Sequence, residues 1–168
     1  MSKRFVKSAD TSTSVASSQR DLEKLLRRYG ATDFTMGSDW DKRLARVGFR
    51  VPDTPGSKVL VPVRLEISIT AVAEALGLTK GRHSWSSPRT PTQAGWEQAE
   101  RVAWRHLVLW VDAACSATNA GMQTMSEAFL AHTLVRAPDG QIKKVSVMLD
   151  EAAGEGGYRG LLPAAGQT

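Results

Sequence analysis

The clearest candidate for chemistry in this sequence is a basic stretch at residues 80–89 with a tryptophan in its middle. Trp85 is surrounded by Lys80, Arg82, His83 and Arg89. Lysine and arginine bind phosphate groups, and an exposed indole can stack on a nucleobase for about 1–3 kcal/mol. Two prolines and a glycine favour a loop over 79–93. We therefore predict a loop that contacts single-stranded nucleic acid. The alternative is a solvated loop whose tryptophan packs on the core.

Two further groups of arginines are candidate contacts for a polyanion. Arg101 and Arg105 lie four residues apart on a predicted helix, where like charges repel by about 0.2–0.5 kcal/mol. An anionic ligand would relieve that repulsion, although Glu97 can also pair with Arg101. A second candidate surface is the outer face of a predicted sheet, with Arg46, Arg50 and Arg64. An ordinary charged surface is the alternative for both groups.

Carboxylates give a weaker signal. Asp33, Asp39 and Asp41 cluster around a predicted turn, and such a cluster can hold Mg²⁺ in a nuclease. Nuclease sites usually add a Glu and a Lys on paired strands, and nothing places Glu66 and Lys42 beside the three aspartates. We interpret the aspartates as turn-forming residues.

Other catalytic and ligand signals are missing. No nucleophile-elbow, zinc-protease or phosphate-loop motif occurs. The histidines, at 83, 106 and 132, form no pair at helical metal spacing, and we interpret His106 as a core histidine. Cys115 is alone, which excludes an internal disulfide and a cysteine-based zinc site and favours a reducing compartment. We therefore favour a protein that is not an enzyme, and we assign no metal and no cofactor, with a metal-dependent nuclease kept as an alternative.

Hydrophobic periodicity predicts the elements that position these residues. A stripe of leucines predicts a helix over 19–29, with Ser18 as its N-cap and Gly30 after its end. The period then changes to two and predicts strands at 32–37, 43–51 and 58–69. Pro62 marks the third strand as an edge strand or a bulge. One face of this strand is apolar, with Val59, Val61, Val63, Leu65, Ile67 and Ile69.

The second half of the chain is predicted to be mainly helical. A short helix at 70–78 precedes a long one at 95–119, whose wide apolar arc indicates packing on more than one side. The arc contains Trp96, Ala99, Ala103, His106, Leu107, Trp110, Ala113, Ala114 and Ala117. Thr124 and Glu127 form a capping-box pattern for a helix at 125–132, and a turn at 137–140 predicts a hairpin of strands 133–136 and 141–148.

The predicted fold is α+β: an antiparallel three-stranded meander with a long helix packed across it, short flanking helices and a C-terminal hairpin. The 168 residues suit a single domain at 19–150, with a flexible polar arm at 1–18 and a loose tail at 151–168. The arc of the long helix exceeds what one small sheet can cover, so we expect a homo-oligomer to be feasible.

The overall charge favours an anionic partner. There are 22 Lys and Arg against 17 Asp and Glu, a net charge of +5 that also suits simple solubility. No apolar stretch follows the basic start, so we expect no leader peptide. Arg105, His106 and Asp112 interrupt the most apolar region, 102–117, so we expect no membrane span.

Several short motifs resemble a family of small, uncharacterised bacteriophage and prophage proteins. They are Arg28-Tyr29-Gly30-Ala31-Thr32-Asp33-Phe34, the pair Val47-Gly48-Phe49-Arg50 and Val61-Pro62-Val63, Trp104-Arg105-His106-Leu107, and Phe129-Leu130-Ala131-His132. The stretch around Trp85 and the tail depart from the family pattern. The resemblance implies no established activity, but it implies work in a bacterial host cytoplasm. A meander followed by a long helix also resembles the core of phage single-strand annealing proteins, which is an analogy of fold alone.

Our leading hypothesis is a non-enzymatic accessory protein that binds nucleic acid without sequence specificity, single-stranded DNA in particular, in phage replication or recombination. One rival is a phage-encoded protein-binding module that inhibits or adapts a host protein. Another is a metal-dependent nuclease. Salt dependence separates the first two, since phosphate binding weakens steeply with salt.

Overall fold

The computed structural model describes residues 6–79 and 89–156, with side chains up to residue 153. Its elements in chain order are α1 (Val15–Arg28), β1 (Thr32–Asp39), β2 (Leu44–Pro52), β3 (Leu60–Ser68), α2 (Ile69–Ala75), α3 (Gln93–Asn119), α4 (Met125–Phe129), the 3-10 turn η1 (Leu130–His132), β4 (Leu134–Arg136), β5 (Ile142–Lys144) and α5 (Val145–Gly156). This order confirms the predicted α+β fold.

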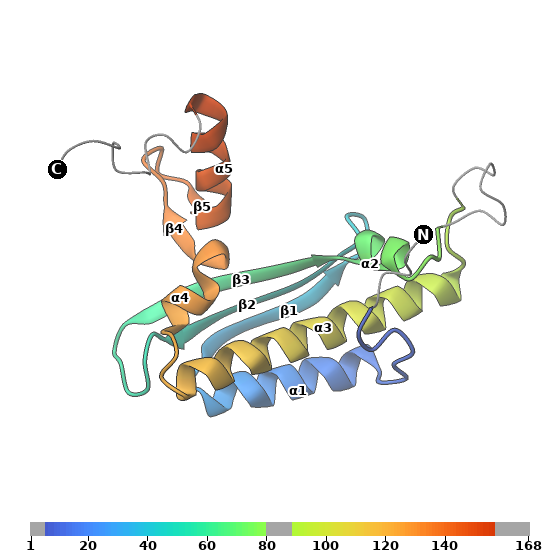
Figure 1. Cartoon of the computed structure of the whole chain (residues 1–168), viewed down its shortest axis with the longest axis horizontal. Helices are drawn as coiled ribbons and strands as arrows, with labels where there is room; N and C mark the ends of the chain where they lie inside the picture. Colours follow the sequence, from blue (N-terminus) through green and yellow to red (C-terminus); the bar gives the residue numbers. More distant parts are fainter. Residues whose placement is uncertain (1–5, 80–88, 157–168) are drawn as a thin grey trace.

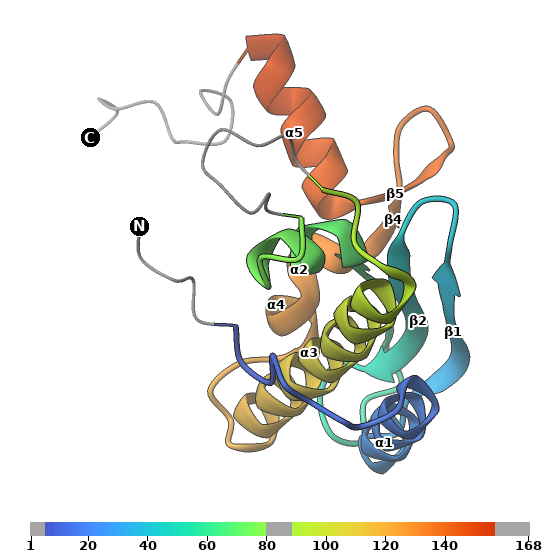
Figure 2. The same cartoon turned by 90° about the vertical axis from the view of Figure 1, so that its right-hand side faces the viewer.

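The body of the molecule has two layers. Strands β1, β2 and β3 form an antiparallel meander in that order, and α1 and α3 cover one face of it (Figures 1 and 2). Alternate residues of the sheet point into this core, as the period of two predicted. They are Ala45, Val47, Phe49 and Val51 of β2 and Val61, Val63 and Leu65 of β3. The opposite, outer face carries the predicted arginines.

Helix α1 begins at Val15, so the start predicted at residue 19 is four residues too late. Ser14 is the N-cap, and its Oγ accepts the N–H of Ser17 at 3.1 Å. Ser18, the predicted cap, is fully buried inside the helix. The predicted arm therefore ends at Ser14. The earlier start is favourable because Val15 packs against the core.

Helix α3 is the central element, but its buried face is rotated from the predicted arc. Trp104 is fully buried although the arc omitted it, whereas Trp110 is 39% exposed. His106 is half-buried and its Nε2 lies 2.7 Å from the carbonyl oxygen of Lys7, so it is not a core histidine. The physical reason is that α3 packs on α1 and α2 as well as on the sheet. Three neighbours shift the centre of the buried arc.

The C-terminal region departs most from expectation. The hairpin exists, but β5 ends at Lys144 and the chain continues as α5, which rises away from the two layers (Figure 1). The strand predicted to reach residue 148 is therefore wrong. Residues 151–156 of the predicted tail belong to α5, and the remainder of that tail lies outside the described residues. Lys143 Nζ pairs with Glu151 at 3.0 Å, which ties the helix to the hairpin.

Candidate nucleic-acid interface

One end of the molecule gathers three segments that are distant in sequence. The β1–β2 turn, helix α2 and the first turn of α3 meet there (Figure 1, right). The N–H of Ile69, the first residue of α2, donates to the carbonyl of Arg43 in the turn at 2.8 Å. Leu78 packs beside the first turn of α3, since a Cβ placed on Gly95 would lie 3.8 Å from its Cδ1. The turn, α2 and α3 therefore form one continuous surface.

An arginine lies between two tryptophans on this surface. The Cζ of Arg43 is 5.1 Å from the ring centroid of Trp40 and 4.5 Å from that of Trp96. Such cation–π contacts contribute about 0.5–1 kcal/mol each at exposed sites. Trp40 is 45% exposed, so much of its ring faces solvent. The arrangement links the exposed ring of Trp40 to Trp96, which is partly buried and packs against the core.

The backbone of this turn is also unusual. Arg43 has a φ of 49°, in the left-handed region that non-glycine residues adopt at a cost of order 1 kcal/mol or more. Strained residues of this kind cluster at ligand sites. Here the conformation turns the chain into β2 with the guanidinium between the two indoles.

Thr79 and Arg89, which flank most of the predicted basic loop, lie next to each other near this surface. Lys80, Arg82, His83 and Trp85 lie outside the described residues. The N–H of Arg89 donates to the carbonyl of Thr79 at 2.8 Å, and Arg89 is exposed. Arg89 is therefore fixed close to the first turn of α3.

Arg101 and Arg105, the predicted helix contacts, both have partners within the molecule. Arg101 donates to Oε1 of Gln98, from Nη2 at 2.6 Å, and Arg105 forms a 3.7 Å ion pair with Asp21 of α1. Glu97 accepts instead from Gln93 at 3.0 Å, so the suggested pairing of Glu97 with Arg101 is wrong. Both arginines already have partners on the flank of α3, which weakens their candidacy as phosphate contacts.

The outer face of the sheet holds a groove of about 510 Å³ beneath the β4–β5 hairpin. Arg50 and Arg64 line it together with Arg136 of β4, which the sequence did not single out. Arg50 forms a 3.4 Å ion pair with Asp33, and within the described residues Arg64 has no ion pair. The apolar part of the lining consists of Phe49, Leu60, Pro62, Val63, Leu134, Val135 and Ile142.

Arg46, the third arginine predicted on this face, is neutralised. Its Nε donates to Glu66 at 2.7 Å, and Lys144 also bonds to that carboxylate. Burial raises the pKa of Glu66, but the hydrogen bonds from Lys144 and Arg46 outweigh it, so the pKa lies below its ordinary value. Burial and the charge of Lys144 lower the pKa of His132 nearby. The site is a structural ion cluster that joins the hairpin to the sheet.

The aspartates form no metal site in the described part of the chain, where no group of three potential ligands occurs. Asp39 Oδ1 accepts the backbone N–H of Lys42 at 3.0 Å, which confirms its interpretation as a turn residue. Asp33 has a φ of 57° and pairs with Arg50. Asp41 is exposed.

The sequence analysis missed Trp40. It placed Trp96 on the apolar arc of α3, and Trp96 is partly buried and packs against the core. One signal for Trp40 was available. It stands in the charged run Ser38-Asp39-Trp40-Asp41-Lys42-Arg43, and a tryptophan in such a run has few apolar neighbours to pack against.

Comparison with protein-family models, curated proteins and solved structures finds no match to this chain. The described helices include none that is long and apolar enough to cross a membrane.

Proposed function

We propose that this protein binds single-stranded nucleic acid, DNA in particular, without sequence specificity. The contact surface would be the end that carries Trp40, Arg43 and Trp96, together with the adjoining basic loop. The observation that carries the proposal is the exposed indole of Trp40, which lies against Arg43 at the end of the molecule where α3 begins.

This surface offers the two interactions that sequence-independent binding needs. A base can stack on the open face of Trp40, because every base presents a π-face. Arg89, together with Lys80 and Arg82 of the predicted loop, would supply cations for the phosphates. Arg43 fixes the indole before binding, which reduces the entropy lost when a base stacks on it.

The biological setting of the proposal follows from the motifs that resemble phage and prophage proteins. We propose an accessory role in phage replication or recombination, in the cytoplasm of a bacterial host. Stacking and phosphate contacts suit transient single strands, which arise in both processes.

The test is fluorescence anisotropy of labelled single-stranded and duplex DNA across a salt series. Trp40→Ala removes the stacking surface and should weaken single-strand binding by about 1–3 kcal/mol, or roughly 5- to 150-fold. The matched control is Trp110→Ala, because Trp110 is similarly exposed at 39% but lies on α3 beside Phe129. A combined Lys80→Ala, Arg82→Ala and Trp85→Ala variant tests the loop.

Binding that weakens with salt, with a log–log slope of about −0.7 for each phosphate contacted, would support the proposal. Loss of affinity in the Trp40 and loop variants, but not in the Trp110 variant, would place the contact. Absence of binding even at about 50 mM salt would refute the proposal.

The groove on the outer face favours a second candidate function, a protein-binding module. Leu60 is 42% exposed and Ile142 is 64% exposed, and Arg64 beside them has no ion pair among the described residues. Apolar side chains next to an unneutralised cation fit an acidic, aliphatic segment of a host protein. The variant Arg64→Glu separates the two functions. It should leave DNA binding unchanged if the groove serves a protein, and weaken DNA binding if the groove contacts phosphates.

A further inference from the structure

The two edges of the meander differ in how they are protected. The β3 edge carries Pro62, and Thr133 forms an isolated bridge to Val63 beside it. Strand β1 pairs with β2 alone, and among the described residues no hydrogen bond reaches its other edge. Figure 2 shows β1 as the outermost strand of the sheet. It contains no Lys, Arg or Pro, the residues that usually prevent edge pairing.

The register indicates which backbone groups of β1 point outward. Pro62 has no N–H to donate, so its pair with Arg50 fits a position without hydrogen bonds between β2 and β3. Because hydrogen bonding alternates along each strand, the even-numbered residues of β2 then face β1. Gly48 pairs with Thr35 and Arg46 with Gly37. The N–H and C=O groups of the intervening Met36, and those of Ser38, are therefore directed away from the sheet.

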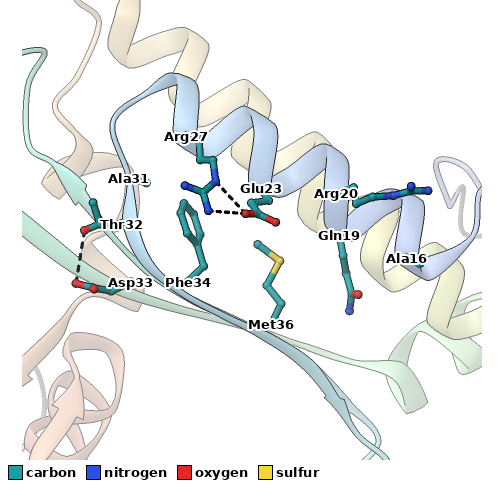
Figure 3. Close-up of a pocket in the computed structure, with 10 residues that line it drawn as sticks. All are labelled: Ala16, Gln19, Arg20, Glu23, Arg27, Ala31, Thr32, Asp33, Phe34 and Met36. Atoms are coloured by element: carbon teal, nitrogen blue, oxygen red, sulfur yellow. Dashed lines mark hydrogen bonds and ion pairs between the residues drawn. The ribbon is translucent and has the colours of Figure 1, made fainter.

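A groove of about 920 Å³ runs beside this edge, between β1 and α1 (Figure 3). The β1 side presents Phe34 and Met36, which are large, apolar and only half-buried. On α1 the lining side chains lie at helical spacing. They are Ala16, Gln19, Arg20, Glu23 and Arg27. Glu23 already pairs with Arg27 at 2.7 Å, and Arg27 lies 5.1 Å over the ring of Phe34.

We propose that β1 pairs with β1 of a second copy of this chain, antiparallel about a two-fold axis at Gly37. Met36 of one copy would then pair with Ser38 of the other, so that the outward backbone groups bond to each other and six strands form one sheet. A Cβ at Gly37 would meet no atom within 4 Å, so there is room for close approach at the axis. The side chain of Met36 lies on the helix face, so each copy inserts it into the groove of its partner.

The charges of α1 favour a second copy over an unrelated strand. The two-fold axis places the two α1 helices side by side and antiparallel. The stripe that faces the partner alternates in sign, with Arg20, Glu23 and Arg27. Arg20 of one copy therefore faces Glu23 of the other, twice in each dimer, and the surface is complementary to itself as a two-fold interface requires.

Sedimentation equilibrium of the full chain over a wide concentration range tests the dimer. We expect the mass to rise from 18.2 kDa toward twice that value. Arg20→Glu should weaken the dimer by about tenfold, because both symmetry-related ion pairs become repulsive, and adding Glu23→Arg should restore it. Arg28→Glu is the matched control, since Arg28 is an exposed α1 arginine outside the groove.

A second measurement does not depend on any variant. Amide hydrogen exchange of Met36 and Ser38 should slow as protein concentration rises, while exchange in the exposed β1–β2 turn should not change. A wild-type protein that stays monomeric at every concentration would overturn the proposal. An Arg20→Glu dimer as stable as the Arg28→Glu dimer would also overturn it. DNA binding by the Trp40 surface is independent of either result.

Discussion

The hydroxyl of Ser38 holds together a small polar network inside the core, and its removal should be costly. Ser38 Oγ accepts the indole N–H of Trp104 at 3.1 Å and donates its own proton to Glu100 Oε1. Trp104 is fully buried and Glu100 is 7% exposed, so water cannot replace the hydroxyl easily. The variant Ser38→Ala leaves both groups without this partner.

The magnitude follows from what is left unpaired. A buried N–H without a partner costs about 1–3 kcal/mol, and a lost hydrogen bond to a carboxylate costs about 1.5–3 kcal/mol. We expect Ser38→Ala to lower the free energy of unfolding by about 3–5 kcal/mol. For a chain of this size the melting temperature should fall by about 6–20 °C.

Urea denaturation of four proteins measures this effect: wild type, Ser38→Ala, Trp104→Phe and the double variant. Because phenylalanine has no N–H, Ser38→Ala should cost about 1–3 kcal/mol less in the Trp104→Phe background. Ser116→Ala, at an exposed position of α3, should change stability by no more than about 0.5 kcal/mol. A loss below about 1 kcal/mol for Ser38→Ala, or equal losses in both backgrounds, would refute the network.

Three further outcomes follow from the structure. Because the pKa of Glu66 lies below its ordinary value of 4.5, its ionisation stabilises the folded state above about pH 4.5, and this contribution disappears as the pH falls through the folded-state pKa. Denaturation at several pH values should therefore show a steeper acid loss for wild type than for Glu66→Gln, and equal slopes would contradict the ion cluster. Burial, with a smaller effect of Asp112, raises the pKa of Cys115 to about 12, so a thiol reagent should label the protein only when it unfolds. Rapid native labelling would show that the packing of α3 is wrong. Thr124→Ala removes the capping box of α4 and should cost about 1 kcal/mol in thermal denaturation, against no change for exposed Thr54→Ala.

The sequence predicted the meander well because a sheet with one buried face requires apolar residues at every second position of each strand. Ala45, Val47 and Phe49 alternate with polar or small neighbours, and only a strand places such residues on one side. Pro62 likewise indicated that its strand lies at an edge, because proline has no N–H to donate to a neighbouring strand in the middle of a sheet. These are local signals, and they need no knowledge of the tertiary contacts.

Elements whose form depends on distant partners were not predictable. Val145, Met148 and Leu149 suit a strand or a helix, and α5 forms where the region packs on η1 and Lys143 reaches Glu151. The buried arc of α3 was misplaced because periodicity cannot show that α1 and α2 flank the helix. Trp104 is buried by that flanking, and Trp110 stays partly exposed.

The candidate site was predicted in part for a related reason. Cation-rich stretches are visible in sequence, so residues 80–89 could be proposed as a contact. The placement of Trp40 and Trp96 on either side of Arg43 joins the β1–β2 turn to α3, more than fifty residues later. Likewise Arg136 reaches the groove of Arg50 and Arg64 only because β4 lies beside β3. No local sequence pattern predicts these contacts between distant residues.

Of the two helices that cover the sheet, α1 precedes the three strands in the chain and α3 follows them. The two helices therefore become available at different times during synthesis on the ribosome. When β3 has been synthesised, α1 is present but α3 is still about fifty residues from completion. At a synthesis rate of about 5–20 residues per second, roughly 3–10 s pass before α3 is complete and can pack on the apolar face of the meander. A fragment that ends before Gln93 should therefore expose that face and aggregate. The chain as a whole can reach its folded state only after most of it has been made.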